Sequence, residues 1–204
     1  MLQRQGDRLA RKPVVVAISG SPSPASATAE LADHVLGLLA PGVEIGGHIR
    51  LRDLDPAALM SGRADDAGLA AALRDVEAAD GLVIATPIYK AAYSGLLKAF
   101  LDVLPQFGLA GRTVLPLATG GSLAHVLALD YALRPVLQSM GARHIVQGTF
   151  VAAGQMQRDG EAFGLDPGAA ELLGEAVLHF THAVADASPK TLFGHPRPLR
   201  EAAE

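Results

Sequence analysis

The sequence predicts an α/β fold in which a doubly wound, five-stranded parallel sheet is covered by helices on both faces. Short apolar runs bounded by turn residues recur along the chain, and the segments between them repeat their apolar residues with helical spacing. This alternation of strand and helix is the pattern of a doubly wound sheet. At 204 residues, half of them hydrophobic, the chain is long enough to bury one core.

The expected strands are the apolar runs at 14–18, 43–51, 81–85, 113–118 and 142–151. The first and third contain no polar residue, as expected of strands that are buried on both faces. The second contains Gly46-Gly47, which predicts a bulge or an edge position. The fourth contains Pro116, which cannot donate to a sheet ladder, so we expect a local irregularity there. The fifth is interrupted by Gln147-Gly148.

One helix is expected after each strand. Four of them are defined by apolar stripes that should face inward: Leu31, Val35, Leu38 and Leu39; Leu69, Leu73 and Val76; Leu97, Phe100, Leu101 and Leu104; and Leu172, Leu173, Ala176, Val177 and Phe180. The helix after the fourth strand is predicted to run over about 123–140, with a kink or a loosened turn at Pro135. Segments 52–65 and 154–167 are predicted to be loops.

Composition and charge exclude several classes of protein. The net charge of −4 gives no basic surface for nucleic acid or acidic lipid, and no apolar run reaches the roughly 20 residues that span a bilayer. The chain has no cysteine, which excludes disulfides, thiolate catalysis and cysteine-ligated metals. We therefore expect a cytoplasmic protein with no nucleic-acid or membrane partner. Residues 1–12 are expected to be a mobile extension, 13–187 a single domain and 188–204 a loose tail.

A hydroxyl-rich turn follows the first strand, in the segment 19–28, which we call the first loop. A strand, a turn of this kind and a helix N-terminus together suit a phosphate, because backbone N–H groups, hydroxyls and the helix dipole all favour an anion. The lysine-containing phosphate loop of NTPases and the G-x-G-x-x-G turn of dinucleotide sites are both missing. The alternative is an ordinary turn whose serines only cap a helix.

Two further loops follow strands and have unusual composition. The second loop, 86–94, combines a proline with aromatic residues and suits a flat ring, and the third loop, 119–122, contains Gly-Gly, which lets the backbone approach a ligand. In a doubly wound sheet all three lie at the carboxyl ends of strands, where ligands bind. A phosphate at one end and a flat heterocycle at the other describe flavin mononucleotide (FMN), which itself would carry the hydride.

Three segments resemble the NAD(P)H-dependent FMN reductases of the flavodoxin-like superfamily, most of all the subgroup that supplies reduced flavin to alkanesulfonate monooxygenases. They are Gly20-Ser21-Pro22 with Ser26 and Thr28, ADGLVIATPIYKAAYSGLLKAFLDVLP (79–105) and VLPLATGGSLAHVLALDYALRPVL (114–137). The resemblance covers 14 to about 151. It implies a flavodoxin-like sheet of order 2-1-3-4-5, FMN with NADPH or NADH as substrates, a flavin-dependent monooxygenase as transient partner, and a homo-oligomer, either a tetramer or a dimer.

The resemblance also implies site residues, matched position by position. The FMN phosphate would lie on Ser21, Ser26, Ala27 and Thr28; the ribityl chain and ring along Pro87, Ile88, Tyr89 and Lys90; and the isoalloxazine edge at Thr119, Gly120 and Gly121. No catalytic acid or base and no metal is implied. The family often has arginine where this chain has Ser23, so phosphate affinity is lower here unless another basic group substitutes. Tyr131 resembles a tyrosine found at a π-type irregularity of an interface helix, where it would modulate the reaction.

Other candidates carry less weight. His179 and His182 are spaced to share one helix face but lack a third metal ligand, and His125 follows the third loop. Asp53 and Asp55 form an acid pair or a plain turn and cap. Three alternative functions stay open: an FMN-retaining reductase of quinones or azo compounds, a flavodoxin-type electron carrier, which the mildly acidic composition disfavours, and a flavin-free relic.

Overall fold

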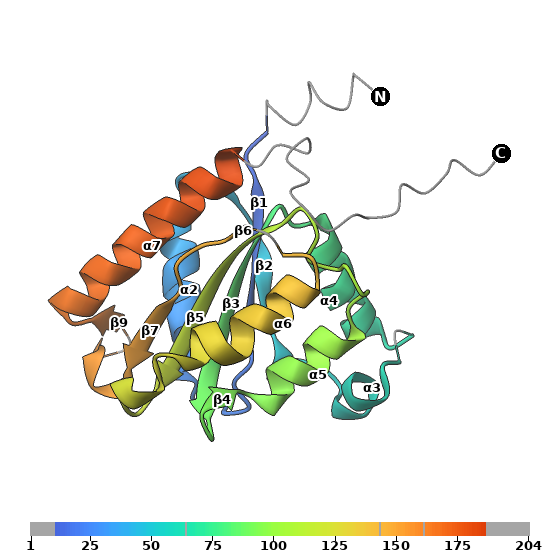
Figure 1. Cartoon of the computed structure of the whole chain (residues 1–204), viewed down its shortest axis with the longest axis horizontal. Helices are drawn as coiled ribbons and strands as arrows, with labels where there is room; N and C mark the ends of the chain where they lie inside the picture. The colour runs from blue at the N-terminus through green and yellow to red at the C-terminus, as the bar shows by residue number, and fades with distance from the viewer. Residues whose placement is uncertain (1–10, 64, 143, 161, 187–204) are drawn as a thin grey trace.

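A parallel sheet in the order β2-β1-β3-β5-β6 forms the middle layer of the protein (Figure 1). The computed structural model describes residues 11–186 except 64, 143 and 161. The strands of the sheet are β1 (Val14–Ser19), β2 (Glu44–Arg50), β3 (Gly81–Tyr89), β5 (Thr113–Gly120) and β6 (His144–Ile145), with β7 (Thr149–Ala152) also pairing with β5. All of these pairings are parallel. The predicted fold class and strand order are confirmed.

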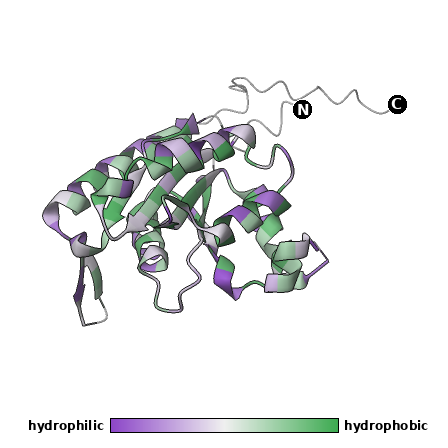
Figure 2. Cartoon of the chain, turned by 60° about the horizontal axis from the view of Figure 1, so that its bottom comes forward, coloured by the Kyte–Doolittle hydropathy of each residue, from purple (hydrophilic) through white to green (hydrophobic). Residues whose placement is uncertain are grey.

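Helices cover both faces of the sheet. On one face lie α2 (Ala27–Leu39) and α7 (Pro167–Asp186), and on the other lie α4 (Ala67–Ala78), α5 (Gly95–Val103) and α6 (Arg134–Ser139) (Figure 1). Hydrophobic residues gather in the sheet and on the helix faces turned towards it (Figure 2). Most of the predicted inward residues are buried, but the prediction is wrong for Leu38 and Leu172, which are exposed. In each case the predicted apolar stripe includes one residue more than the helix face that is buried.

The edge strand β2 contains the predicted bulge. Val15 pairs with Ile45 and Val16 with Gly47, so Gly46 is the extra residue. A Cβ atom at Gly46 would lie 2.8 Å from the side chain of Val14, which explains why glycine stands there. Both predictions for this strand, a bulge and an edge position, are confirmed.

Pro116 lies in the middle of β5, and the neighbouring strand is broken opposite it: β5 pairs with β6 before this residue and with β7 after it. The N–H of Val146 donates to the carbonyl of Val114 at 3.0 Å, so the next bond of the ladder would join the N–H of residue 116 to the Val146 carbonyl. Proline lacks that donor. The Nη2 of Arg134 donates to the Val146 carbonyl instead, at 3.2 Å. The predicted irregularity at Pro116 is confirmed.

Two segments predicted to be loops contain regular structure. The first holds the short helices η1 (Leu51–Asp53) and α3 (Pro56–Ser61), and Asp55 caps α3 by accepting from the N–H of Ala58 at 2.7 Å. The second holds η4 (Ala153–Gln155) and an antiparallel hairpin of β8 (Met156–Asp159) and β9 (Ala162–Leu165). These elements are too short to show a hydrophobic period in the sequence.

The prediction of one long helix over 123–140 is wrong in its extent, but the loosened turn expected at Pro135 is present. The segment forms η2 (Leu123–His125), a π-helical turn η3 (Leu129–Leu133) and then α6. The π-helical turn continues directly into α6, and Pro135 lies in the first turn of α6. The helix is therefore loosened just before the proline, which cannot donate a backbone hydrogen bond.

The described part of the predicted N-terminal extension is held in place. Arg11 contacts the carboxylate of Asp80 at 2.9 Å, and the Nζ of Lys12 donates to the carbonyl of Pro41 at 3.1 Å. Residues 1–10 and the predicted tail, 188–204, lie outside the described residues. Among the helices that the structure describes, none is long and apolar enough to cross a membrane.

Candidate active site

The first two loops are joined by hydrogen bonds at the carboxyl edge of the sheet. Ser94 Oγ donates to the carbonyl of Gly20 at 2.6 Å, and the N–H of Gly20 donates to the carbonyl of Ala85 at 2.9 Å. A Cβ at Gly20 would lie 2.8 Å from Cβ of Leu97, so only glycine lets the two loops approach this closely. Ser94 is also the N-cap of α5. A serine before an apolar helical run is typical of an N-cap, so the cap at Ser94 could have been predicted. Nothing in the sequence indicates the contact of Ser94 with the first loop.

The first and third loops meet through two threonines. Thr28 Oγ1, in the first turn of α2, and Thr119 Oγ1, near the end of β5, lie 2.6 Å apart, and both side chains are buried. The second and third loops adjoin because Pro87 pairs with Thr119 in the sheet. The three predicted loops therefore adjoin at the carboxyl edge of the sheet, at the switch point between β1 and β3, where ligands of doubly wound sheets bind.

The N-terminus of α2 presents hydrogen-bond donors of the kind that bind an anion. We call Ser21, Ser26, Ala27 and Thr28 the anion seat. Ser26 is the N-cap and accepts from the N–H of Ala29 at 3.1 Å, so the predicted capping role is present. The first intrahelical bond is the one from the N–H of Glu30, hence the helix gives no acceptor to the N–H groups of Ala27 and Thr28.

Hydroxyl hydrogens add to these backbone donors. Ser26 Oγ accepts from Ala29, and Ser21 Oγ accepts from the N–H of Ser23 at 3.3 Å. A hydroxyl that accepts a hydrogen bond keeps its own hydrogen for another partner. The anion seat thus combines two N–H groups with two hydroxyl donors at the positive end of a helix dipole, which is a suitable environment for one phosphate.

The second loop is shorter than predicted because β3 continues through it. Pro87 and Ile88 are strand residues with buried side chains, and a tight hairpin then joins β3 to β4 (Ala92–Tyr93). The two central residues of this turn, Lys90 and Ala91, have φ values of 51° and 62°. Two-residue hairpin turns commonly have positive φ at both central positions, a conformation that is unfavourable for residues with side chains. The turn holds Tyr89, which is 50% exposed, and Lys90 at the open side of the site.

The two glycines of the third loop have different environments. A Cβ at Gly120 would lie 2.9 Å from Cζ of Phe150, so this glycine is required by packing. A Cβ at Gly121 would meet no atom within 4 Å, and the residue is exposed. Gly121 therefore leaves its backbone open to a ligand, whereas Gly120 allows the Phe150 ring of β7 to approach β5 closely.

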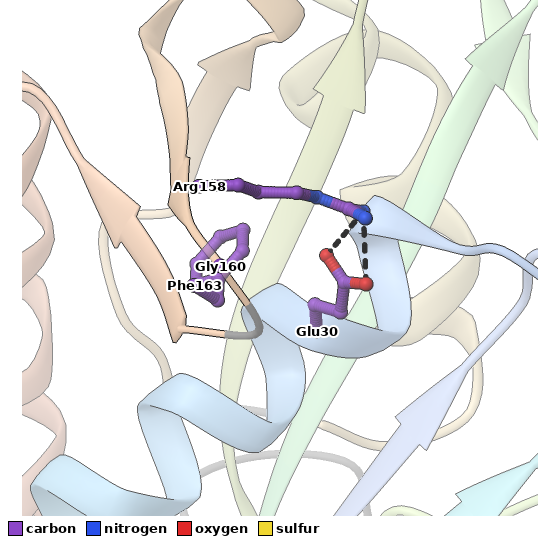
Figure 3. A pocket seen from close by; sticks show the side chains of 4 residues that line it. All are labelled: Glu30, Arg158, Gly160 and Phe163. Atoms are coloured by element: carbon purple, nitrogen blue, oxygen red, sulfur yellow. Dashed lines mark hydrogen bonds and ion pairs between the residues drawn. The ribbon is translucent and has the colours of Figure 1, made fainter.

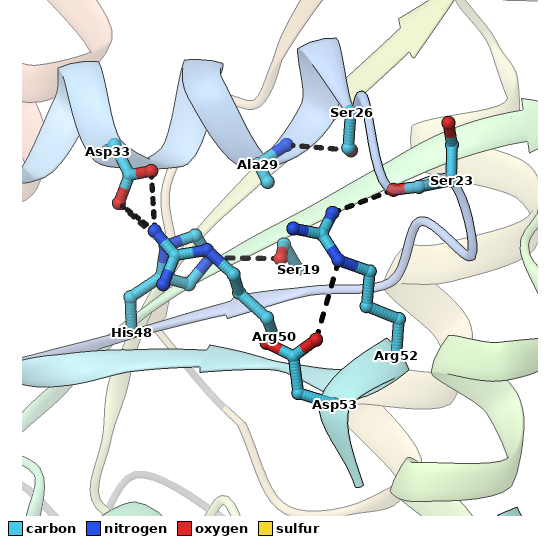
Figure 4. Close-up of polar contacts among 9 residues, drawn as sticks. All are labelled: Ser19, Ser23, Ser26, Ala29, Asp33, His48, Arg50, Arg52 and Asp53. Carbon is cyan, nitrogen blue, oxygen red and sulfur yellow. Dashed lines mark hydrogen bonds and ion pairs between the residues drawn. The ribbon is translucent and has the colours of Figure 1, made fainter.

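Beside the first loop, a polar cluster connects α2 with β2 and η1 (Figure 4). The ring of His48 contacts Asp33 Oδ1 at 2.7 Å through Nδ1 and Ser19 Oγ at 2.9 Å through Nε2. Burial lowers the pKa of His48; Asp33 opposes this shift, and the nearby arginines reinforce it. The order Ser–His–Asp matches a nucleophilic triad, but the residue Ser19 is only 2% exposed, so a substrate has no access to it. We interpret this series of hydrogen bonds, Ser19–His48–Asp33, as structural.

Arginine side chains complete this cluster. Arg50 donates to both carboxylate oxygens of Asp33, at 3.0 and 2.8 Å, and Arg52 Nη1 donates to the carbonyl of Ser23 at 2.7 Å (Figure 4). No pattern in the sequence indicates that His48, Arg50 or Arg52 lies beside the first loop. Their contacts join β2 and η1 to β1, α2 and the first loop, 15 to 29 residues away along the chain.

Tyr131 lies on the π-helical turn η3, as the resemblance implied, and its side chain is 79% exposed. This exposure excludes the alternative of a half-buried tyrosine in the isolated chain. η3 lies against β4, so it borders the second loop. His125, on η2, lies between the third loop and this turn. The same segment exposes three further apolar side chains: Leu123, Val126 and Leu127.

A cavity of about 260 Å³ lies beside the first turn of α2, under the β8–β9 hairpin (Figure 3). It is lined by Glu30, Arg158, Gly160 and Phe163. Arg158 Nη2 donates to both oxygens of Glu30, at 2.8 and 2.6 Å. The two charges neutralise each other, so this cavity attracts an anion less than the anion seat does.

The remaining candidates from the sequence are placed away from a site. His179 and His182 are both exposed on α7, and the described residues bring no three potential metal ligands together. Asp55 is the cap of α3, and Asp53 lies 3.5 Å from Arg52 Nε. The loops thus offer donors and an open backbone to a ligand, but no paired acid and base.

Comparisons with known proteins identify the family of the chain. The profile of a family described as NADPH-dependent FMN reductase matches residues 13–157. An FMN reductase (NADPH) of Pseudomonas putida is 39% identical over 187 residues, which cover 91% of each chain. One from Escherichia coli K12 is 43% identical over 143 residues, covering 70% of this chain and 74% of that protein. The apo structure of an NADH:FMN oxidoreductase is similar with a TM-score of 0.84 at 50% identity, covering 93% of this chain and 100% of that one.

Proposed function

The chain belongs to the NADPH-dependent FMN reductase family of flavodoxin-like oxidoreductases, and we propose that its FMN binds where the first, second and third loops meet. The observation that carries this proposal is the joining of the three loops by Ser94–Gly20 and Thr28–Thr119 beside an anion seat. A ligand with a phosphate at one end and a ring at the other would be contacted by all three loops at once.

The residues present fit the phosphate of FMN. The anion seat offers the N–H groups of Ala27 and Thr28 together with the hydroxyls of Ser21 and Ser26. These neutral donors at a helix N-terminus bind an anion without requiring a basic residue in the loop itself. The serines therefore act both as caps and as ligands, and the two interpretations of the first loop do not compete.

The residues around the second and third loops fit the ribityl chain and the ring of FMN. Tyr89 and Lys90 stand on the open side of the hairpin turn, and the backbone of Gly121 is accessible. We propose that these groups border the isoalloxazine ring, with Thr119 and Gly120 beneath its edge. Pro87 and Ile88 have buried side chains, so they would contribute through their backbone and by supporting the turn.

FMN, when bound, supplies the ring that accepts a hydride from reduced nicotinamide. The task of the protein is to hold both rings in alignment, which by itself accelerates a two-substrate reaction. The anion seat would fix the phosphate end, while the hairpin turn and the third loop would fix the ring and leave one face open for nicotinamide. No side chain has to exchange a proton at the reacting atoms for this step.

We further propose that the product, FMNH₂, is released to a flavin-dependent monooxygenase of the alkanesulfonate type. The support is the resemblance of the segments 79–105 and 114–137 to that subgroup, including Tyr131 on its π-helical turn. An anion seat without a basic residue in its own loop suits an enzyme that releases its flavin. An FMN-retaining quinone or azo reductase, or an electron carrier, would instead hold flavin through purification.

A homo-oligomer, either a tetramer or a dimer, is proposed on the same basis. Leu123, Val126, Leu127 and Tyr131 expose apolar surface on one continuous segment beside the second loop, a concentration that commonly marks an interface. Sedimentation of the wild type and of the double variant Leu127→Ser/Tyr131→Ser tests this: the variant should dissociate at concentrations where the wild type is associated. An unchanged assembly would place the interface elsewhere.

The function is tested by measuring NADPH and NADH oxidation over a range of FMN concentrations. We expect the purified protein to be colourless and its oxidation of nicotinamide to saturate with added FMN. Gly121→Val, which adds a side chain where the ring edge is proposed to lie, should raise the KM for FMN, whereas Gly174→Ala on the outer face of α7 should not. A yellow protein would favour a retained cofactor, and no FMN-dependent oxidation with either nucleotide would contradict the reductase.

A further inference from the structure

The first loop contains no charged side chain between Ser19 and Thr28. A phosphate ester carries close to two negative charges at neutral pH, and proteins usually place at least one cation against it. Two arginines that are far from the loop in sequence, Arg50 at the end of β2 and Arg52 in η1, lie in the polar cluster beside it. Their contacts distinguish them.

Arg50 is bound to a carboxylate, and Arg52 is directed to the loop. Arg50 Nη2 contacts both oxygens of Asp33. Arg52 Nη1 donates instead to a neutral acceptor, the carbonyl of Ser23, and its nearest carboxylate, Asp53, is 3.5 Å from Nε (Figure 4). Among the described residues none accepts a hydrogen bond from Arg52 Nη2. The side chain is mostly buried, with 23% exposed, and so its charge is only partly screened by water.

Arg52 acts on the anion seat through the backbone of Ser23. The N–H of this residue donates to Ser21 Oγ at 3.3 Å, and its carbonyl accepts from Arg52. The two peptide groups that flank Ser23 are therefore both held, the preceding one by the hydroxyl of Ser21 and the following one by the guanidinium of Arg52. Pro22 and Pro24, on either side of Ser23, have no N–H of their own to anchor the turn. Without Arg52, the turn would retain the contact with Ser21 Oγ and the bond that Ser23 Oγ donates to the carbonyl of Ala25 at 3.0 Å, and neither of these joins it to another element.

We propose that Arg52 is the positioning residue of the anion seat: it holds the Ser21–Ser23 turn in the shape that binds phosphate and supplies the positive charge that the first loop lacks. This inference rests on the proposed function, because it assumes that the FMN phosphate lies in the anion seat. It assigns to η1, which follows the edge strand, a role in the affinity for the phosphorylated flavin over the unphosphorylated one.

The test compares FMN with riboflavin, which has the same ring and ribityl chain but no phosphate. Dissociation constants are measured from the quenching of flavin fluorescence in the full-length protein. Arg52→Met should weaken FMN binding by about tenfold to a hundredfold, since a charge-assisted contact is lost, and should leave riboflavin binding unchanged. Arg52→Lys, which keeps the charge but not the planar fork, should recover part of the loss. In turnover, the KM for FMN should rise with kcat unchanged.

Arg50→Met is the matched control. It removes the same charge only two residues from Arg52, but the side chain of Arg50 binds Asp33 and not the first loop. Circular dichroism and thermal unfolding check that each variant is folded, and Arg52→Lys provides the comparison if Arg52→Met is not. Equal losses for FMN and riboflavin, no loss for either, or an equal loss in Arg50→Met would overturn the inference about Arg52 and leave the reductase standing. A wild type that binds FMN no better than riboflavin would overturn the phosphate position itself.

Discussion

Thr28 Oγ1 and Thr119 Oγ1 lie 2.6 Å apart, although 91 residues separate them in the chain. One hydroxyl donates to the other, and the accepting hydroxyl keeps its hydrogen for a further partner. This contact closes the site between α2 and β5. It also means that a ligand at the anion seat and the position of the third loop are linked through a single pair of buried side chains.

The pair can be tested by replacing each threonine with valine, which has the same shape but no hydroxyl. Thr28→Val and Thr119→Val should each lower the free energy of unfolding by about 1–3 kcal/mol, since each leaves a buried hydroxyl without its partner. The double variant should lose less than the sum of the two, because no polar group then stays unsatisfied. Urea unfolding of the four proteins measures this coupling, and simple additivity would show that the hydroxyls do not depend on each other.

Gly20→Ala should be destabilising. Its Cβ would lie 2.8 Å from Cβ of Leu97 and 2.9 Å from Ser94 Oγ, so the first loop would have to move away from α5. We expect a loss of about 1–3 kcal/mol in the free energy of unfolding, as for other overpacked sites, and a higher KM for FMN. Gly37→Ala is the control: its Cβ meets no atom within 4 Å in the middle of α2, and it should stabilise by about 0.5–1 kcal/mol. A neutral Gly20→Ala would contradict the tight approach of the two loops.

His48 should make folding depend on pH. Burial lowers its pKa below the ordinary value of 6.5, so the unfolded chain takes up this proton first as the pH falls. The stability contribution is complete above pH 6.5 and is lost as the pH falls from there through the lowered pKa of the folded state. The difference in unfolding free energy between the wild type and His48→Gln should therefore change over this range. Burial also lowers the pKa of His34, but this residue is retained in both proteins. Parallel curves would therefore show that His48 does not titrate differently on folding.

Arg134 should matter more to stability than an exposed ion pair. Its guanidinium donates to the carbonyls of Ile145 and Val146, at 2.9 and 3.2 Å, where the sheet ladder is interrupted. Arg134→Met should cost about 1–3 kcal/mol, because two partly buried carbonyls lose their donor. Lys98→Met, which breaks an exposed pair with Asp102, should cost at most about 1 kcal/mol. Thermal unfolding of both variants gives the comparison, and equal effects would mean that water replaces the guanidinium without loss.

The sequence was sufficient where one residue type has one physical consequence. Continuous apolar runs identified β1 and β3, Gly46-Gly47 predicted the bulge in the edge strand, and Pro116 predicted a break in the ladder. The hydroxyl-rich first loop and the Gly-Gly of the third loop were placed correctly at the carboxyl edge of the sheet. Each of these predictions depends on backbone geometry that is local to the residues concerned.

Predictions failed where periodicity alone had to decide what a side chain faces. Leu38 and Leu172 have the helical spacing of their buried neighbours, but they are exposed, and the segment 123–140 is not one continuous α-helix. The contacts of His48 and Arg52 could not be predicted, because they join residues that only the packed sheet brings together. Polar side chains on an edge strand look alike in a sequence whether they face water or a neighbouring loop.

Pro116 weakens one point of the sheet and thereby discourages misaligned pairing. If β6 and β7 shifted along β5, another carbonyl would face Pro116 and find no donor. The Val146 carbonyl would also move away from the guanidinium of Arg134. The alignment that satisfies this carbonyl also places Ala152 beside Gly120 and the ring of Phe150 beneath it. A missing N–H in the core of the protein thus helps to ensure that newly folded chains bring the third loop to the same place each time.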